Sequence, residues 1–242
     1  MTVLRLGQLH VNASRLPSRR GRVVAGRRRL GPLAGILEKS KDIRRANMAS
    51  EAYEDEASRK DDVMGYQLDK ELSSKRTAVY HKPAKGGKAS KTIMSFRGTD
   101  FKDPKDLYSD AHIVLGTQRN SHEFRNDTKD FERVKKKYAN TRVEATGHSL
   151  GANRAAFQSR AHGIKSIGFN KGQSFLDRTS MKDAVLCKLP KRIRPKHCGK
   201  AKTHLISGDP LSSSQRLFGN NTVHKAKKGL SLMARHSMSN FL

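Results

Sequence analysis

A serine flanked by glycines is the first group in this chain whose type and spacing suggest chemistry. In the stretch EATGHSLGAN, residues 144–153, Gly147, Ser149 and Gly151 form a Gly-x-Ser-x-Gly pattern. Ordinary glycine-rich loops also contain it, but here the strand-like TRVEAT precedes and the helix-like LGANRAAFQSRA follows. A strand ending in a tight turn that carries the serine, directly before a helix, is the arrangement of a nucleophile elbow. We therefore predict that Ser149 is a nucleophile.

A serine hydroxyl needs a base to accept its proton and an acid to orient that base. In a sheet with such an elbow, the acid follows the serine in the chain and the base follows the acid. The acids beyond Ser149 are Asp177, Asp183 and Asp209. Asp209 comes directly after the strand-like KTHLIS, at the sheet edge where ligands bind in open α/β folds, and is the preferred acid.

Two histidines follow Asp209 and could act as the base. His236 lies in ARHSMSNFL among apolar residues, whereas His224 lies in NTVHKAKKG, within an expected strand or turn. We favour His236 and keep His224 as the alternative. His148, inside the elbow itself, is interpreted as a packing residue because it leaves the strand in a different direction from Ser149.

Acyl transfer also needs hydrogen-bond donors for the developing oxyanion. The backbone N–H of Leu150, directly after the serine, is one candidate. Thr99, in the strand end SFRGTD, offers both a backbone N–H and a hydroxyl as the second. The alternative interpretation of RGTD is a polar turn.

The segments around these residues alternate between strand-like and helix-like patterns. Such alternation predicts an α/β fold, with a mainly parallel sheet flanked by helices. The first two strands are expected to form a hairpin through Gly86-Gly87. Strands are expected at 76–82, 91–97, 141–146, 164–170 and 202–207, and helices at 49–74, 121–138 and 150–161.

Taken together, these segments resemble the class 3 lipase family, the fungal triacylglycerol lipase type of α/β-hydrolase. The resemblance is carried by IMSFRGTD, DPKDLYSDAHIVLG, ATGHSLGANRA, GFN, HLISGDP and HSMSNF, in the family's order over residues 76–242. It implies a carboxylic ester hydrolase that needs no cofactor, with a lid at about residues 101–120. The residues it implies are Ser149 as nucleophile, Asp209 as orienting acid, His236 as base, and Thr99 and Leu150 as oxyanion donors.

Charge is the main departure from this family. The 242 residues carry a net charge of +28, and residues 1–45 hold twelve Lys and Arg against two acids. A field of this sign attracts polyanions such as nucleic acid or anionic lipid headgroups. Smaller departures are Ala152 and Asn153, where the family has glycine and small residues, and Glu144 in a strand that the family keeps apolar.

We divide the chain into a basic, disordered N-terminal extension at residues 1–47 and a lipase-like α/β-hydrolase domain at 48–242. The extension has few apolar residues and no sustained period. It reads as a nuclear or nucleic-acid-binding arm, as an organelle transit peptide, or as an upstream segment absent from the mature protein. The third interpretation rests on Met48, where the composition turns abruptly acidic.

The expected substrate is a lipid or phospholipid ester at an anionic membrane surface, with nucleic acid as a further partner of residues 1–47. The alternative is a basic nucleic-acid-associated or membrane-binding protein on a hydrolase-like scaffold with little or no catalysis. The sequence has no secretory signal pattern and no run of 18 apolar residues. An intracellular location, nuclear, virion-associated or organellar, is therefore favoured.

The two cysteines, Cys187 and Cys198, are too few for a disulfide scaffold, although they could pair. With His197 and His204 they could also bind zinc. The spacing fits no usual zinc motif, and His197 and Cys198 are adjacent, so no metal is expected.

Overall fold

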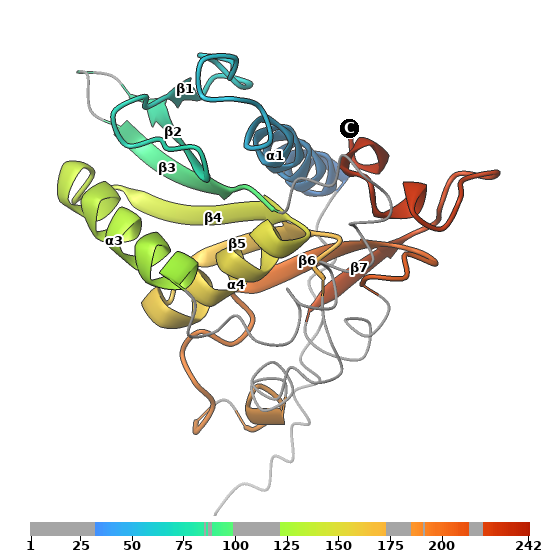
Figure 1. Cartoon of the computed structure of the whole chain (residues 1–242). Helices are drawn as coiled ribbons and strands as arrows, with labels where there is room; N and C mark the ends of the chain where they lie inside the picture. The colour runs from blue at the N-terminus through green and yellow to red at the C-terminus, as the bar shows by residue number, and fades with distance from the viewer. Residues whose placement is uncertain are drawn as a thin grey trace, which may run out of the picture.

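The computed structural model contains a seven-stranded sheet whose strands lie side by side in chain order, from β1 at one edge to β7 at the other (Figure 1). The first three strands pair antiparallel and β3 to β7 pair parallel. Their bounds are Gln67–Leu68 (β1), Thr77–Pro83 (β2), Ala89–Phe96 (β3), Arg142–His148 (β4), Lys165–Phe169 (β5), Ala201–Ile206 (β6) and Asn221–His224 (β7). The structure describes residues 32–84, 86, 89–98, 122–172, 185–190, 192–212 and 220–242, with side chains from residue 40 in the first helix and residue 125 in the second.

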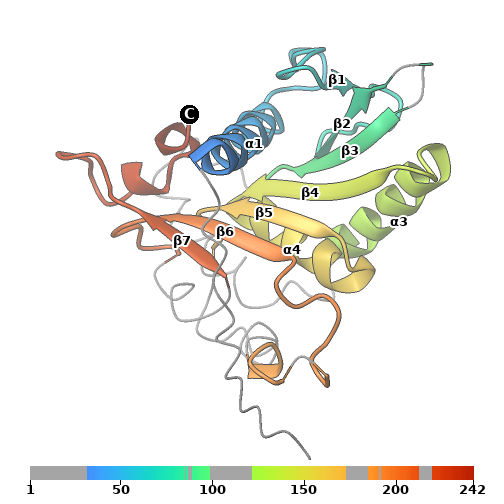
Figure 2. The same ribbon diagram turned by 180° about the vertical axis from the view of Figure 1, so that it is seen from behind.

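Helices cover both faces of this sheet. Helix α1 (Pro32–Glu51) crosses one face over β3 to β5, and α3 (His122–Lys137) and α4 (Leu150–His162) lie on the other, as Figures 1 and 2 show from opposite sides. Two short 3-10 helices, η3 (Ala234–His236) and η4 (Met238–Asn240), lie near the C-terminal end beside α1. This is the expected α/β-hydrolase-type arrangement, a mainly parallel sheet flanked by helices.

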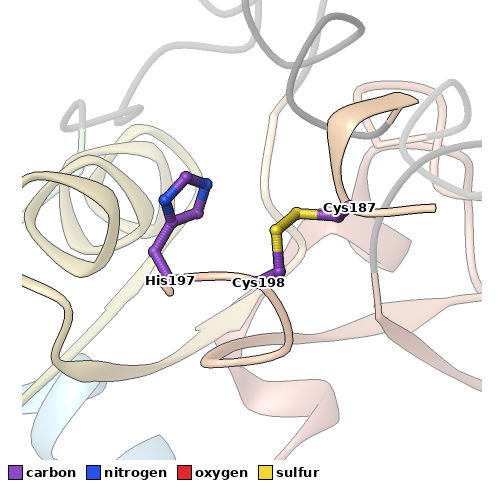
Figure 3. Close-up of side chains that lie close together, drawn as sticks. All are labelled: Cys187, His197 and Cys198. Carbon is purple, nitrogen blue, oxygen red and sulfur yellow. A yellow bond between two sulfur atoms is a disulfide. The ribbon is translucent and has the colours of Figure 1, made fainter. Parts of the chain in front are cut away.

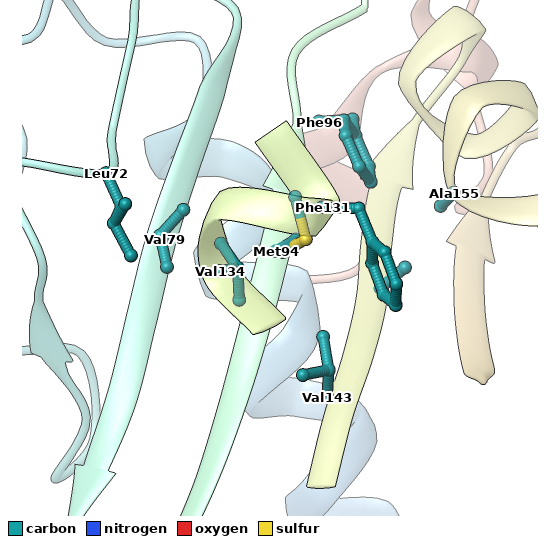
Figure 4. Close-up of a cluster of buried hydrophobic side chains, with 9 residues drawn as sticks. Leu72, Val79, Met94, Phe96, Phe131, Val134, Val143 and Ala155 are labelled. Atoms are coloured by element: carbon teal, nitrogen blue, oxygen red, sulfur yellow. The ribbon is translucent and has the colours of Figure 1, made fainter. Parts of the chain in front are cut away.

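Alternating side chains of the central strands build a core on each face. Within β3, Ile93 joins the core under α1, and the next residue, Met94, joins the core under α3. In the α3 core, Phe131 and Val134 come from one stripe of the helix, as the sequence predicts (Figure 4). The full α3 core consists of Leu72, Val79, Met94, Phe96, Phe131, Val134, Val143, Ala145 and Ala155.

The boundary predicted at residue 48 is wrong, because it falls inside α1. The helix runs through it without a break, and Ala46, Met48 and Ala49 are buried against the sheet. The extension looks disordered from its charge, yet its Arg45 is buried and paired with Glu144 of β4, which Lys91 also contacts at 2.7 Å. Glu144, a departure from an apolar strand, is therefore half of the contact that docks α1. Residues 1–31 lie outside the described part of the chain.

Most predicted elements agree with the structure to within a few residues, but the helix expected over 49–74 does not. Its helical part ends at Glu51, and turns and the short β1 follow. The composition of this segment favours a helix, but its burial does not. Val63 and Tyr66 pack into the core under α1 and Leu72 packs into the core under α3, and one face of a single helix could not reach both cores. The short β1 is not among the predicted strands, and β7 falls in the segment expected to be a strand or turn.

Candidate active site

Ser149 occupies a strained turn between the end of β4 at His148 and the start of α4 at Leu150. Its backbone has φ 54° and ψ −122°, a region that residues with a side chain rarely adopt. The turn is held because the Ser149 N–H donates to the Phe169 carbonyl at 3.0 Å, and the Ser149 carbonyl accepts from the Ala152 N–H at 3.1 Å. The predicted strand–turn–helix context of the serine is therefore present.

Close backbone packing explains the two glycines of the pattern. A Cβ added to Gly151 would overlap the carbonyl of Phe96 at the end of β3, and one added to Gly147 would overlap the backbone of Gly151. Only glycine lets β3, β4 and the first turn of α4 approach this closely. The pattern thus fixes the position of Ser149 relative to the end of the neighbouring strand.

Ser149, His236 and Asp209 form one continuous hydrogen-bonded chain, although 87 residues separate the first two. The distances are 2.9 Å from Ser149 Oγ to His236 Nε2 and 2.9 Å from His236 Nδ1 to Asp209 Oδ2. A carboxylate only accepts, so the neutral imidazole carries its proton on Nδ1, and Nε2 can accept the serine proton. All three side chains are buried.

The environment of Asp209 keeps it ionised. Burial raises the pKa of this carboxyl, but the hydrogen bond and charge of His236, together with donors from Ser212 and the Leu211 N–H, outweigh burial and bring the pKa below its usual 3.8. Ser212 Oγ donates to Oδ2 at 2.5 Å and the Leu211 N–H to Oδ1 at 3.0 Å. An ionised carboxylate in this place stabilises the imidazolium that forms when His236 takes a proton.

Sequence analysis missed a second hydrogen-bonded chain that holds the backbone of His236. His148 Nε2 lies 2.6 Å from the His236 carbonyl oxygen, and His148 Nδ1 lies 2.9 Å from the hydroxyl of Tyr53. Because a carbonyl only accepts, Nε2 of the neutral ring carries the proton and Nδ1 accepts from Tyr53. Burial, with the nearby His236, lowers the pKa of His148 to about 3, so this ring is neutral at pH 7.

Asn170 completes the support of the segment that carries His236. Its Nδ2 donates to the carbonyls of Arg235 and His236 at 2.9 and 3.0 Å, and its Oδ1 accepts from the Ile206 N–H at 2.9 Å. Asn170 is fully buried and has a φ of 40°, a backbone region in which asparagine is among the few tolerated residues. In the sequence it stands in GFN, a segment for which spacing alone indicates no role.

The remaining predicted site residues fall into three groups. Leu150 opens α4, where the first backbone N–H groups of a helix have no partner within the helix and can face an anion. Thr99, the segment 101–120 and the rejected acids at 177 and 183 lie outside the described residues. The alternative base, His224, lies on β7 with its Nε2 2.8 Å from His204 Nδ1, and the chain brings it to His204 and not to Ser149.

The residues behind the elbow that differ from the family have structural partners. Ala152 packs against Gly168 of β5, where a Cβ would meet the Ala152 methyl at 2.8 Å. Asn153 donates to the Gly172 carbonyl at 2.6 Å. Arg154 forms a buried ion pair with Asp127 of α3 and donates to the Arg97 carbonyl at 2.8 Å, directly before Gly98 and Thr99. These contacts fix the strand end from which the second oxyanion donor is expected.

The four residues considered as zinc ligands do not lie together in the structure. Cys187 and Cys198 are joined in a disulfide, with His197 beside them (Figure 3), and His204 is instead next to Asp42 and His224 on the sheet. The ligand atoms of Cys187, His197 and Cys198 lie within 4.8 Å of one another. Zinc binds thiolates, which the disulfide does not offer, so the group does not fit a metal in this state.

Among the described helices, none is long and apolar enough to cross a bilayer.

No protein-family model and no curated protein matches the chain. Solved structures similar to it include Lip2 lipase from Yarrowia lipolytica, with 13% identity, a TM-score of 0.49 and coverage of 84% of this chain and 82% of that one. A mutant form of MDLA from Penicillium cyclopium has 17% identity, a TM-score of 0.47 and coverage of 84% of each chain. Extracellular lipase LipA from Serratia marcescens has 18% identity and a TM-score of 0.37, over 75% of this chain and 30% of that one. Because all three TM-scores are below 0.5, the proposals below rest on the geometry of this chain.

Proposed function

We propose that the protein is a serine hydrolase that cleaves carboxylic esters of lipids through an acyl-enzyme intermediate. The observation that carries the proposal is the unbroken chain from Asp209 through His236 to Ser149, with both hydrogen bonds at 2.9 Å. The strained turn that presents Ser149 at the N-terminus of α4 supports it independently. A nucleophile, a base and an orienting acid in this order are what acyl transfer by a serine requires.

The mechanism follows from the proton positions. His236 Nε2 takes the proton of Ser149 as its oxygen attacks the ester carbonyl, and the Leu150 N–H donates to the resulting oxyanion. We assign the second donor to Thr99, as the resemblance implies. The imidazolium, stabilised by Asp209, then protonates the leaving alcohol, and water repeats the sequence on the acyl-enzyme.

Labelling with a fluorophosphonate tests the nucleophile directly, because this probe reacts with activated serines. We expect labelling of the wild type, none of Ser149→Ala, and normal labelling of the control Ser58→Ala, whose serine is exposed and far from the site in sequence. Ester turnover should fall by at least ~10³-fold in Ser149→Ala. Full esterase activity in purified Ser149→Ala would exclude this assignment.

The substrate class is proposed from charge. A protein with a net charge of +28 is attracted to anionic bilayers, by about 1 kcal/mol for each Lys or Arg near the surface. We therefore propose a lipid or phospholipid ester at such a surface as the substrate. Hydrolysis in vesicles should rise with the fraction of anionic lipid and fall at high salt, and indifference to both would contradict this choice.

The same charge favours a second candidate, a nucleic-acid-associated or membrane-binding protein with little or no catalysis. Binding of nucleic acid through residues 1–47 is the specific form of this proposal, and the C-terminal part of that segment belongs to α1. Tight, salt-dependent RNA or DNA binding together with no fluorophosphonate labelling would favour it over the hydrolase. Tight RNA or DNA binding together with fluorophosphonate labelling of Ser149 would mean that one chain has both activities.

A further inference from the structure

A cavity of about 880 Å³ lies between α1 and the β6–β7 edge of the sheet. It is bounded by α1 at Asp42, Ile43 and Ala46, by β6 and β7, and by the tail at residues 240–242. We call it the β7 cavity. The side chains of Ser149, His236 and Asp209 do not line it, and its volume lies in the ~300–1,000 Å³ range of small-molecule sites.

One side of the β7 cavity is apolar and open to solvent. Phe169, Ile206 and Phe241 line it, and Phe169 and Phe241 contact one another with ring centroids 5.1 Å apart. Phe169 and Ile206 are each only 2% exposed, so the accessible part of this side consists of Ile43, which is 39% exposed, and half-buried Phe241. Apolar side chains left accessible at a cavity are typical of a binding surface.

The other side is positively charged. Asp42 is the only carboxylate side chain among the lining residues, and it lies 2.9 Å from Lys202 Nζ and 3.1 Å from His204 Nε2, so its charge is compensated within the wall. Lys225 and Lys227 are exposed at the rim, and none of the described carboxylates forms an ion pair with either. The cavity therefore presents two cations that pair with no described carboxylate side chain, next to an apolar wall.

The floor between these two sides is rigid. His204 Nδ1 and His224 Nε2 are 2.8 Å apart, and the His204 ring stacks on Phe169 with centroids 5.4 Å apart. His204 Nε2 also lies 3.1 Å from Asp42 Oδ2, so α1, β6 and β7 all contact this pair of rings. A preformed floor lowers the entropy lost when a ligand binds.

Two other occupants are disfavoured by charge. Residues 1–31 of the same chain contain eight arginines and no acid, so they would be repelled by Lys225 and Lys227. A second copy of the chain carries the same net charge of +28. A ligand with one negative head and one apolar chain matches both sides of the cavity at once.

We propose that the β7 cavity is a binding site for a long-chain carboxylate, with its carboxylate at Lys225 and Lys227 and its chain along Ile43 and Phe241. The site is separate from the proposed hydrolytic centre and does not depend on catalysis. The tail that lines the cavity also contains His236 a few residues earlier, so a bound carboxylate would contact the segment that carries the base.

Titration of the full chain with the fluorescent fatty acid cis-parinaric acid tests the proposal. The Ser149→Ala protein serves as the background, so that the result does not depend on hydrolysis. We expect saturable binding that weakens about tenfold or more, equivalent to about 1.4 kcal/mol, in Ile43→Asp and in the double variant Lys225→Glu with Lys227→Glu. Ile43 and both lysines are exposed, so the changes leave the cores intact, which thermal melting would verify.

Matched controls carry the same chemical changes elsewhere on the surface. Leu232→Asp and the double variant Lys136→Glu with Lys188→Glu, all at exposed positions, should keep wild-type affinity. Dodecanoate should displace the probe, and dodecanol should displace it far less well. Binding that survives both cavity changes, or that falls equally in the controls, would overturn the site, and equal displacement by dodecanol would overturn the role of charge.

Discussion

His148 makes the stability of the protein depend on pH in a way that can be measured. The side chain is 5% exposed, and its pKa is about 3 in the folded chain against an ordinary value of 6.5. Burial is the first cause, because a charged imidazole would lose its hydration, and the nearby His236 adds to it. Protonation would also remove the acceptor that Nδ1 offers to the Tyr53 hydroxyl at 2.9 Å.

The sign and size of the effect follow from proton linkage. Between pH 6.5 and 3 the unfolded chain holds a proton on His148 that the folded chain lacks, so acid favours the unfolded chain. The free energy of unfolding therefore falls by ~1.4 kcal/mol per pH unit in this window. From pH 6.5, where the unfolded group is half protonated, to pH 4.5 the contribution of this one group is a loss of about 2 kcal/mol.

The assay is denaturant unfolding of His148→Gln and wild type at pH 6.5 and 4.5. Glutamine does not titrate and keeps a donor for the His236 carbonyl, so the variant should lose about 2 kcal/mol less between the two pH values. The control Ser58→Ala, at an exposed serine that does not titrate, should retain the wild-type pH dependence. An unchanged pH dependence in His148→Gln would refute the reasoning.

Three further changes probe the fold around the site. Gly151→Ala forces a methyl group onto the Phe96 carbonyl, so it should lower the free energy of unfolding by about 1–3 kcal/mol and displace Ser149. A variant with the turnover and the unfolding free energy of the wild type would contradict this. Glu144→Gln leaves buried Arg45 without its partner and should cost about 3–5 kcal/mol, whereas the control Glu71→Gln, at an exposed pair, should cost about 1 kcal/mol or less in the same denaturant assay. Cys198→Ser removes a disulfide between residues 11 apart and should lower the free energy of unfolding by about 2–3 kcal/mol. Adding reductant to the wild type should have the same effect. Two free thiols in the oxidised wild type would contradict the disulfide.

The disulfide also bears on the expected location. Disulfides persist in oxidising compartments and are rare in the cytosol. The link between Cys187 and Cys198 therefore does not favour the intracellular location expected from the sequence, which stays a prediction. Determining the thiol state of the native protein would decide between the two.

Local patterns in the sequence were sufficient for the elbow and for most of the sheet. The glycines around Ser149 indicate a turn that only small residues allow, and the structure shows the close approach to Phe96 that demands them. Val143 and Ala145 alternate with Glu144, a two-residue period that indicates a strand, and in the structure both apolar residues join the same core. The candidate acid Asp209 could be chosen from the sequence because sheet edges collect residues that follow strands.

What the sequence by itself determined was therefore local: the elbow, the strands and the candidates that follow them. Only the tertiary structure decided that α1 belongs to the folded unit, that Tyr53 and His148 hold the backbone of His236, and that His224 contacts His204 and not Ser149. The physical reason is that local backbone conformation depends mainly on residues close in the sequence, so an alternating period or a turn pattern is enough to predict it. Contacts such as Tyr53 with His148, 95 residues apart, depend instead on how whole elements pack, and buried charges such as Arg45 look like surface residues until their partner is known.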